Sequence, residues 1–217
     1  MDRSRDYSRK ATTLKLFHPN SITITSETAV GKSATLRELR SRLGPSWTYT
    51  SGGEIMRKFA KDLGISIKDF ARINREHPER GYDKLCDQEL ARIGQQDRLV
   101  AEGRLTHVFV PMAFHVKLIC PMEVRASRRA KDLYSRNLAQ VSRDIAERDR
   151  DDNDRYGYLY PNCLWPNSDF DLLIHTNETT APEVAEMIIS SHAEWADKKE
   201  REGLLTTPIR QSDCLTG

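Results

Sequence analysis

Cysteine is scarce in this sequence of 217 residues, and the spacing of the cysteines argues against a CxxC motif and against a zinc site. The four cysteines are Cys86, Cys120, Cys163 and Cys214, and no two of them form a CxxC pair. No Cys/His spacing resembles that of a zinc site either. Scattered thiols are typical of a reducing compartment, so we expect a cytoplasmic protein in which the cysteines are incidental.

Long hydrophobic runs are missing as well. No apolar stretch approaches the roughly 18 residues that a membrane span needs. Residues 1–10 are charged and lack the apolar segment of a secretory signal. We therefore expect no membrane partner.

The sequence also has no large excess of one charge. It contains 34 Lys and Arg against 32 Asp and Glu, which gives a formal net charge of +2. Because the charge is balanced and aromatic residues are few on the basic segments, we expect no nucleic-acid partner. We expect the protein to be a monomer.

The apolar residues that are present gather in five short runs, which predict β-strands. These runs are 21–25, 47–50, 98–101, 115–120 and 171–175. Helical patterns separate them, and capping-box pairs at Ser66 with Asp69 and at Thr180 with Glu183 mark two helix starts. Strands that alternate with helices predict an α/β fold, in which helices flank a five-stranded parallel sheet in three layers.

The polar ends of the chain indicate where this domain begins and ends. Residues 1–20 are polar and basic and predict a flexible arm, and residues 197–217 form a charged, aperiodic tail. We therefore expect the domain to span 21–196. Ligands of parallel sheets bind beyond the carboxyl ends of the strands, here after Thr25, Thr50 and Glu102.

A phosphate-binding loop follows the first predicted strand. Residues 26–33 read SETAVGKS and match the GxxxxGK[ST] P-loop pattern, except that Ser26 replaces its first glycine. In such a loop the backbone N–H groups and the next helix N-terminus bind polyphosphate. Lys32 is expected to act catalytically on the β- and γ-phosphates of ATP, and Ser33 to bind Mg²⁺. The expected ATP-binding residues are Thr28, Ala29, Val30, Gly31, Lys32, Ser33 and Ala34.

Two features leave other interpretations of this loop open. A Gly-Lys-Ser tripeptide can occur by chance where a strand meets a helix. Ser26 also departs from the pattern at a position where glycine normally permits an unusual backbone angle and close approach. Serine can be tolerated at this position, but the nucleotide affinity is expected to suffer.

Five further segments carry a resemblance to a known family. Residues 51–57 (SGGEIMR), 76–79 (EHPE), 87–91 (DQELA), 102–105 (EGRL) and 121–126 (PMEVRA) resemble, in order and spacing, segments of the cytidylate kinases, particularly the archaeal type. The resemblance implies a P-loop NTPase fold with two helical insertions. One insertion, at about 52–96, would bind the acceptor, and the other, at about 131–160, would form a lid.

The resemblance also implies which residues bind the acceptor. Ser51, Arg57, Glu102 and Arg104 fall at acceptor-binding positions. A nucleoside monophosphate carries a dianionic phosphate, which two arginines from two strand ends can bind with paired N–H donors. The alternatives are that Arg57 is a solvated helix residue and that Arg104 pairs with Glu102.

A run of charged residues predicts the lid. Residues 144–155 read DIAERDRDDNDR, and a helix with several arginines can stabilise the transition state of phosphoryl transfer. We expect Arg148 and Arg155 to be catalytic, and Arg150 remains open. Alternatively the run is a solvated helix face with Asp144–Arg148 and Asp151–Arg155 pairs. One of the three arginines on the preceding helix is expected to contact the donor adenine; these are Arg125, Arg128 and Arg129.

Together these features predict an enzyme that uses ATP and Mg²⁺ to phosphorylate a pyrimidine nucleoside monophosphate, most simply CMP or dCMP. Two alternatives remain at this point. The same fold can act on another small acceptor, or the chain can be a nucleotide-binding regulatory module without turnover, which Ser26 favours.

Overall fold

A five-stranded parallel sheet forms the centre of the computed structural model, which describes residues 20–134, 137–161 and 169–202. The strand order is β2-β3-β1-β4-β5, and every neighbouring pair is parallel. The strands are β1 (Ile22–Thr25), β2 (Thr48–Ser51), β3 (Leu99–Gly103), β4 (Phe114–Ile119) and β5 (Leu172–His175). All five predicted strands are therefore confirmed, each within two residues of its expected ends.

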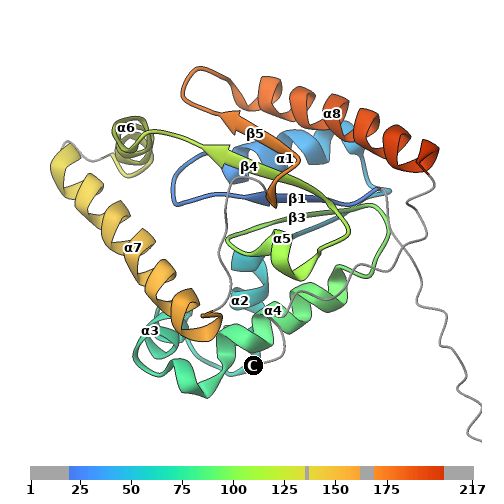
Figure 1. The fold of residues 1–217 in the computed structure, drawn as a ribbon. Coiled ribbons are helices and arrows are strands. Elements are labelled where there is room, and N and C mark those ends of the chain that lie inside the picture. Colours follow the sequence, from blue (N-terminus) through green and yellow to red (C-terminus); the bar gives the residue numbers. More distant parts are fainter. Residues whose placement is uncertain (1–19, 135–136, 162–168, 203–217) are drawn as a thin grey trace, which may run out of the picture.

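Helices cover both faces of this sheet and give three layers (Figure 1). Helices α1 (Lys32–Leu43) and α8 (Ala181–Arg201) pack together on one face. Ile22 and Ile24 of β1 point into that side, where they pack in a buried core with residues such as Leu39 and Ile188. The short helix α5 (Thr106–Phe109), which the sequence analysis did not anticipate, lies against β1 and β3.

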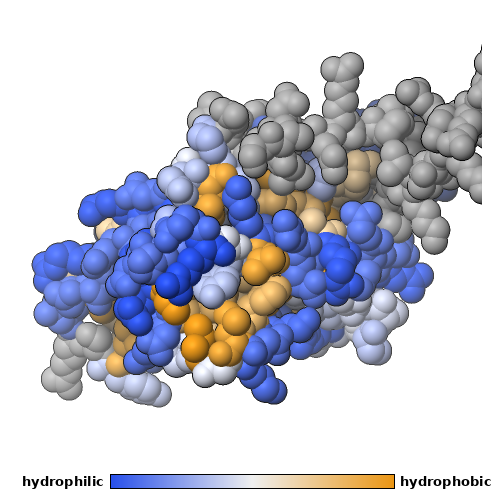
Figure 2. Space-filling view, turned by 90° about the horizontal axis from the view of Figure 1, so that it is seen from below, coloured by the Kyte–Doolittle hydropathy of each residue, from blue (hydrophilic) through white to orange (hydrophobic). Residues whose placement is uncertain are grey.

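The second face also carries the helical insertion expected at about 52–96. It consists of α2 (Gly52–Asp62), α3 (Ile67–Glu76), the 3₁₀ turn η1 (Pro78–Arg80) and α4 (Tyr82–Ile93). Ser51 and Ser66 cap α2 and α3 by accepting hydrogen bonds from backbone N–H groups three residues later. Seen from below, this side of the molecule is mostly hydrophilic, with several smaller hydrophobic areas between the charged side chains (Figure 2).

Two helices form the insertion expected as a lid. Helix α6 (Met122–Asp132) is followed by the long α7 (Leu138–Leu159), and both share a small buried core. The buried residues of that core are Ala126, Ala130, Val141 and Ile145. Helix α7 extends from α6 towards α3, so it crosses in front of the carboxyl ends of the strands (Figure 1).

The domain ends later than expected. Helix α8 begins with the predicted capping box of Thr180 and Glu183 and continues to Arg201, beyond the boundary expected at residue 196. Lys198, Lys199 and Arg201 in its last turn are favourable near the negative end of the helix dipole. The arm at 1–19 and the end of the tail at 203–217 lie outside the described residues. Among the helices that the structure describes, none has the length and apolarity required to cross a membrane.

Candidate active site

The phosphate loop lies between the end of β1 and the start of α1. Its unusual backbone angles fall at Ala29 (φ 62°) and Gly31 (φ 118°), and Gly31 is the N-cap of α1. Ser26 is not among the described residues with positive φ, so this position does not require glycine here. The unusual backbone angle that glycine normally permits at this position is not present at Ser26, because the left-handed conformation occurs further along the loop. The expected loss of nucleotide affinity stays a prediction.

The Ser26 hydroxyl has a role of its own in the loop. It donates to the Glu27 carbonyl oxygen at 2.9 Å and accepts a hydrogen bond from Lys32 Nζ at 2.9 Å. Lys32 Nζ also donates to the carbonyl oxygens of Ser26 and Glu27, at 3.1 and 2.8 Å. The Lys32 side chain thus lies over the phosphate loop, where it is expected to bind the donor phosphates.

Burial lowers the pKa of Lys32 to about 8. The positive charges of Arg104 and Arg148 lower it further, whereas the nearby carboxylates of Glu102 and Asp149 raise it. The ammonium group is therefore protonated at neutral pH but only weakly hydrated, which strengthens its attraction to a phosphate.

A cavity of about 1550 Å³ joins this loop to the second insertion and the lid. Single-ligand pockets typically measure roughly 300–1,000 Å³, so this cavity has room for two nucleotides side by side. Every site residue predicted from the sequence lines it. These residues are Thr28, Ala29, Val30, Gly31, Lys32, Ser33, Ala34, Ser51, Arg57, Glu102, Arg104, Arg148 and Arg155.

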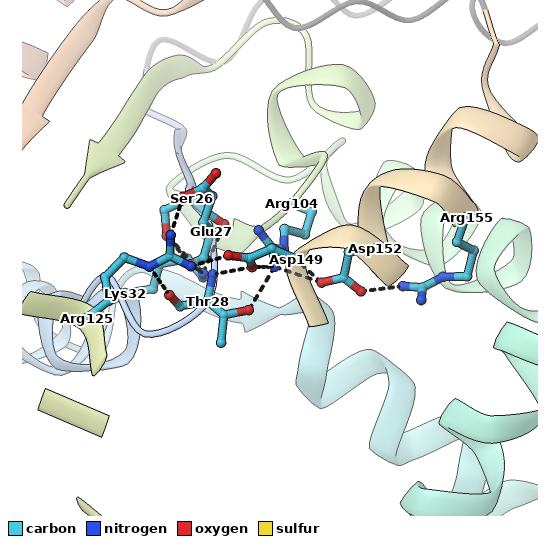
Figure 3. Close-up of polar contacts among 9 residues, drawn as sticks. All are labelled: Ser26, Glu27, Thr28, Lys32, Arg104, Arg125, Asp149, Asp152 and Arg155. Atoms are coloured by element: carbon cyan, nitrogen blue, oxygen red, sulfur yellow. Dashed lines mark hydrogen bonds and ion pairs between the residues drawn. The ribbon is translucent and has the colours of Figure 1, made fainter. Parts of the chain in front are cut away.

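Arg104 does not pair with Glu102, which was one expectation. Its guanidinium binds the carboxylates of Asp149 at 2.5 Å and Asp152 at 2.8 Å, and it donates to the Thr28 hydroxyl at 2.8 Å (Figure 3). Both carboxylates come from α7. The residue expected to hold the acceptor phosphate therefore joins the lid helix to the phosphate loop.

Asp149 is the centre of this network (Figure 3). Besides Arg104 it accepts from the Thr28 backbone N–H at 3.0 Å and from the buried guanidinium of Arg125. Burial alone would raise the pKa of Asp149, but hydrogen bonds from Arg104, Arg125 and Thr28 hold it at about 2. Asp149 is thus ionised throughout the neutral range.

The two arginines predicted as catalytic differ in their surroundings. Arg155 binds Asp83 at 2.8 Å and Asp152 at 2.9 Å, so its charge is neutralised locally. Arg148 makes no hydrogen bond or ion pair within the described part of the chain, although it lines the cavity. Arg148 is therefore free to bind an anion.

The predicted pairs along α7 do not form. Asp144 accepts from Gln140 at 2.6 Å instead of pairing with Arg148. Asp151 pairs with Arg75 of α3 at 3.3 Å instead of with Arg155. The two i,i+4 pairs expected along 144–155 are therefore wrong, because these carboxylates bind partners in other helices or earlier in α7.

The part of the cavity where the acceptor is expected contains Arg57 and Glu102. Arg57 has no ion pair among the described residues, and Glu102 has one buried carboxylate oxygen without a hydrogen-bond partner. Burial raises the pKa of Glu102, Lys32 and Arg57 lower it, and Glu54 raises it. Ser51 lies beside Glu102 in the sheet register, but its hydroxyl already caps α2 by accepting from the Glu54 backbone N–H at 3.0 Å.

The residues present fit a magnesium ion bound together with a polyphosphate. Ser33 is exposed in the first turn of α1, and its hydroxyl has no hydrogen-bond partner in the part of the chain that the structure describes. Within the same residues, no three His, Cys, Asp or Glu side chains cluster as a metal site. Mg²⁺ beside phosphates often takes only one or two protein ligands, so a single hydroxyl suits it.

Two of the three arginines that were expected to contact the donor adenine are bound to other groups. Arg125 donates to the Thr28 carbonyl oxygen at 2.8 Å and binds Glu27 at 2.5 Å. Arg128 donates to the Val30 carbonyl oxygen at 3.2 Å and to Thr176. Arg129 lines the cavity and has no ion pair among the described residues, so it is the remaining candidate.

Comparisons with known proteins agree with this geometry. Residues 22–156 match the AAA domain family AAA_18. The chain is 30% identical over 161 residues to the cytidylate kinase of Methanothermobacter thermautotrophicus, which spans 74% of this chain and 97% of that enzyme. It is 29% identical over 189 residues to the cytidylate kinase of Pyrococcus horikoshii, spanning 83% and 95%.

Solved structures share the fold at lower identity. A gluconokinase from Sinorhizobium meliloti superposes with a TM-score of 0.55 at 12% identity, covering 86% of this chain and 98% of that one. A shikimate kinase from Acinetobacter baumannii superposes with a TM-score of 0.52 at 19% identity, covering 82% and 94%. At these identities the likeness concerns the fold alone.

Proposed function

This chain belongs to the cytidylate kinase family of P-loop nucleoside monophosphate kinases, and we propose that it transfers the γ-phosphoryl group of ATP to CMP, with dCMP as a second acceptor. The observation that carries the proposal is the single cavity, since it brings the phosphate loop and the unpaired arginines Arg57 and Arg148 together. A phosphotransferase needs this arrangement, because the donor and acceptor phosphates must meet while positive charge surrounds them.

The phosphate loop supplies the donor site. Backbone N–H groups around Gly31 and the N-terminus of α1 bind the donor phosphates, and Lys32 places its ammonium on the transferring group. Ser33 would hold Mg²⁺, and the bound ion would neutralise part of the charge on the donor phosphates. Ser26 keeps Lys32 over the loop by the hydrogen bond at 2.9 Å.

The acceptor phosphate lies between the ends of β2 and β3. Arg57 of α2 has no ion pair among the described residues and binds the phosphate; Ser51 and Glu102, which lie opposite each other in the sheet register, line the same cavity. One acceptor phosphate oxygen attacks the γ-phosphorus of ATP, and the bond from that phosphorus to the bridging oxygen of ADP breaks. The acceptor phosphate is a dianion, so no base has to remove a proton first.

The lid arginines act on the transferring group. Arg148 can bind the transferring group without first leaving another partner, because no carboxylate among the described residues is paired with it. Arg104 is bound by Asp149 and Asp152, and Arg155 by Asp83 and Asp152, so each reaches the phosphates only as its carboxylates share or release it. Charge on the transferring group grows towards the transition state, so these contacts favour the transition state over the bound substrates.

A coupled assay of ADP release tests the proposal. The wild-type protein is incubated with ATP, Mg²⁺ and one of CMP, dCMP, UMP, AMP, GMP or TMP at matched concentrations. CMP is expected to give the highest kcat/KM. Faster turnover of AMP than of CMP contradicts the proposed acceptor, and absence of turnover with every acceptor contradicts the proposed reaction.

A further inference from the structure

Asn74 is a buried polar side chain on the cavity wall. It belongs to α3, only 2% of its surface is exposed, and it lines the cavity. Its amide nitrogen has no hydrogen-bond partner in the part of the chain that the structure describes. A buried amide without a partner is unfavourable, so an occupant that supplies the missing hydrogen bond is expected.

The side chains around Asn74 indicate what that occupant is. Ile67, Ala71 and Asn74 are spaced by four and three residues, so they lie on one side of α3, and all three line the cavity. Met56 of α2 contributes a further apolar side chain to the same cavity. Lys68 and Arg75 of α3 also line the cavity, and Arg75 is paired with Asp151. An apolar stripe with an amide beside it suits a flat heterocycle that is covered on its faces and hydrogen-bonded along one edge.

The place of α3 in the fold separates this surface from the phosphate site. Arg57 lies midway along α2, the helix that starts directly after β2, whereas α3 follows α2 and lies at the far end of the lid helix (Figure 1). Arg75, next to Asn74, forms the 3.3 Å ion pair with Asp151 of α7. An acceptor whose phosphate lies at Arg57 therefore has its base available for contact with α3.

We propose that Asn74 anchors the base of the acceptor nucleotide by hydrogen bonding to its Watson–Crick edge; this inference rests on the proposed function. An amide presents a donor and an acceptor side by side. The N3 atom of cytosine accepts a hydrogen bond and its N4 amino group donates one, so the two edges pair twice. Rotation of the amide by 180° exchanges its oxygen and its NH₂ group. The same residue can then pair with uracil, whose N3–H donates and whose O4 accepts.

The test combines one variant with one altered acceptor. Asn74→Leu keeps a side chain of similar size and removes both hydrogen-bonding groups. The 4-deamino analogue of CMP (2-pyrimidinone ribonucleoside monophosphate) keeps the ring and the phosphate but lacks the amino group. Arg72→Leu, on the exposed side of α3, is the matched control.

The wild type is expected to prefer CMP over the analogue by roughly tenfold or more in kcat/KM, as for one well-formed pair of base contacts. In Asn74→Leu that preference is expected to disappear, while ribose 5-phosphate, which has no base, inhibits as before. The melting temperature is expected to stay the same or rise, because the variant removes an unpaired buried amide. Arg72→Leu is expected to retain the preference.

An Asn74→Leu enzyme that still prefers CMP to the same extent overturns the inference. If Asn74→Leu does not fold, the same comparison is made with Asn74→Ala. The proposed function fails on a different result, namely that the wild type does not phosphorylate CMP at all.

Discussion

The Asp149 carboxylate of the lid helix lies 2.5 Å from the Arg104 guanidinium at the end of β3. The same carboxylate binds Arg125 and the Thr28 backbone N–H, so one side chain joins the lid, the phosphate loop and the acceptor side. These contacts make the lid–loop connection an ionic one with little exposure to water, because the side chains of Asp149 and Arg125 are 12% and 4% exposed.

Asp149→Ala is expected to destabilise the protein, since it leaves Arg125 buried with only Glu27 as its carboxylate partner. Removal of one partner of a buried ion pair costs about 3–5 kcal/mol. Denaturant unfolding measures this loss. Asp154→Ala on the same helix is the control, because Asp154 is exposed and has no ion pair among the described residues. Equal stabilities of the two variants would refute the role given to Asp149.

The pKa of Lys32, lowered to about 8 mainly by burial, predicts a pH dependence of donor use. Below pH 8 the ammonium is charged and attracts the donor phosphates; above pH 8 it loses its proton and the attraction weakens. The kcat/KM for ATP is therefore expected to fall as the pH rises through about 8. Lys32→Arg remains charged in this range, so any activity it retains should lack that fall. A wild-type profile that stays flat to pH 9.5 contradicts this account.

Arg148 and Arg57 are expected to affect different kinetic constants. Arg148→Ala should lower kcat with little change in the KM for CMP, and Arg57→Ala should chiefly raise that KM. Each lost ionic contact to phosphate corresponds to roughly 1.5–3 kcal/mol, or about one to two decades. Arg150→Ala is the control for the lid, because Arg150 is exposed and does not line the cavity. If Arg148→Ala and Arg150→Ala have the same kcat, Arg148 takes no part in the chemistry.

Asp87 predicts a pH-dependent stability. Burial raises its pKa from 3.8 to about 7; the Tyr160 hydrogen bond at 2.6 Å and the charge of Arg155 lower it, and Asp83 raises it further. A pKa raised in the folded state stabilises the protein fully below about pH 4, and this contribution is lost as the pH rises through about 7.

The free energy of unfolding of the wild type should therefore decline between pH 5 and 7 by up to about 1.4 kcal/mol per pH unit more than that of Asp87→Asn. Denaturant titrations of both proteins at several pH values measure the difference. Parallel curves would show that Asp87 does not keep its proton in the folded state.

The sequence was sufficient for the strands and the phosphate loop, because their signals are local. Each strand is a short apolar run, and the loop pattern lies between a strand and a helix. The family resemblance added the expected positions of the acceptor residues, and the four residues expected there, Ser51, Arg57, Glu102 and Arg104, line one cavity.

The ion pairs of the lid could not be read from the sequence. Spacing along one helix predicts i,i+4 pairs, but the carboxylates of Asp149, Asp151 and Asp152 bind arginines that are 24 to 76 residues away in the chain, namely Arg125, Arg104 and Arg75. Such pairs depend on how the helices pack. Asn74 gave no signal either, since a single amide in a charged helix is unremarkable until its burial is known.

The most direct test of the central claim is an analysis of products from ATP and CMP with the wild-type protein. Phosphorus NMR or ion-exchange separation of the nucleotides measures ADP and CDP together, with Lys32→Ala as the matched control. The account predicts that CDP and ADP form in equal amounts and that Lys32→Ala forms little of either. ADP without CDP, or CDP formed equally well by Lys32→Ala, would contradict phosphoryl transfer to CMP at this site.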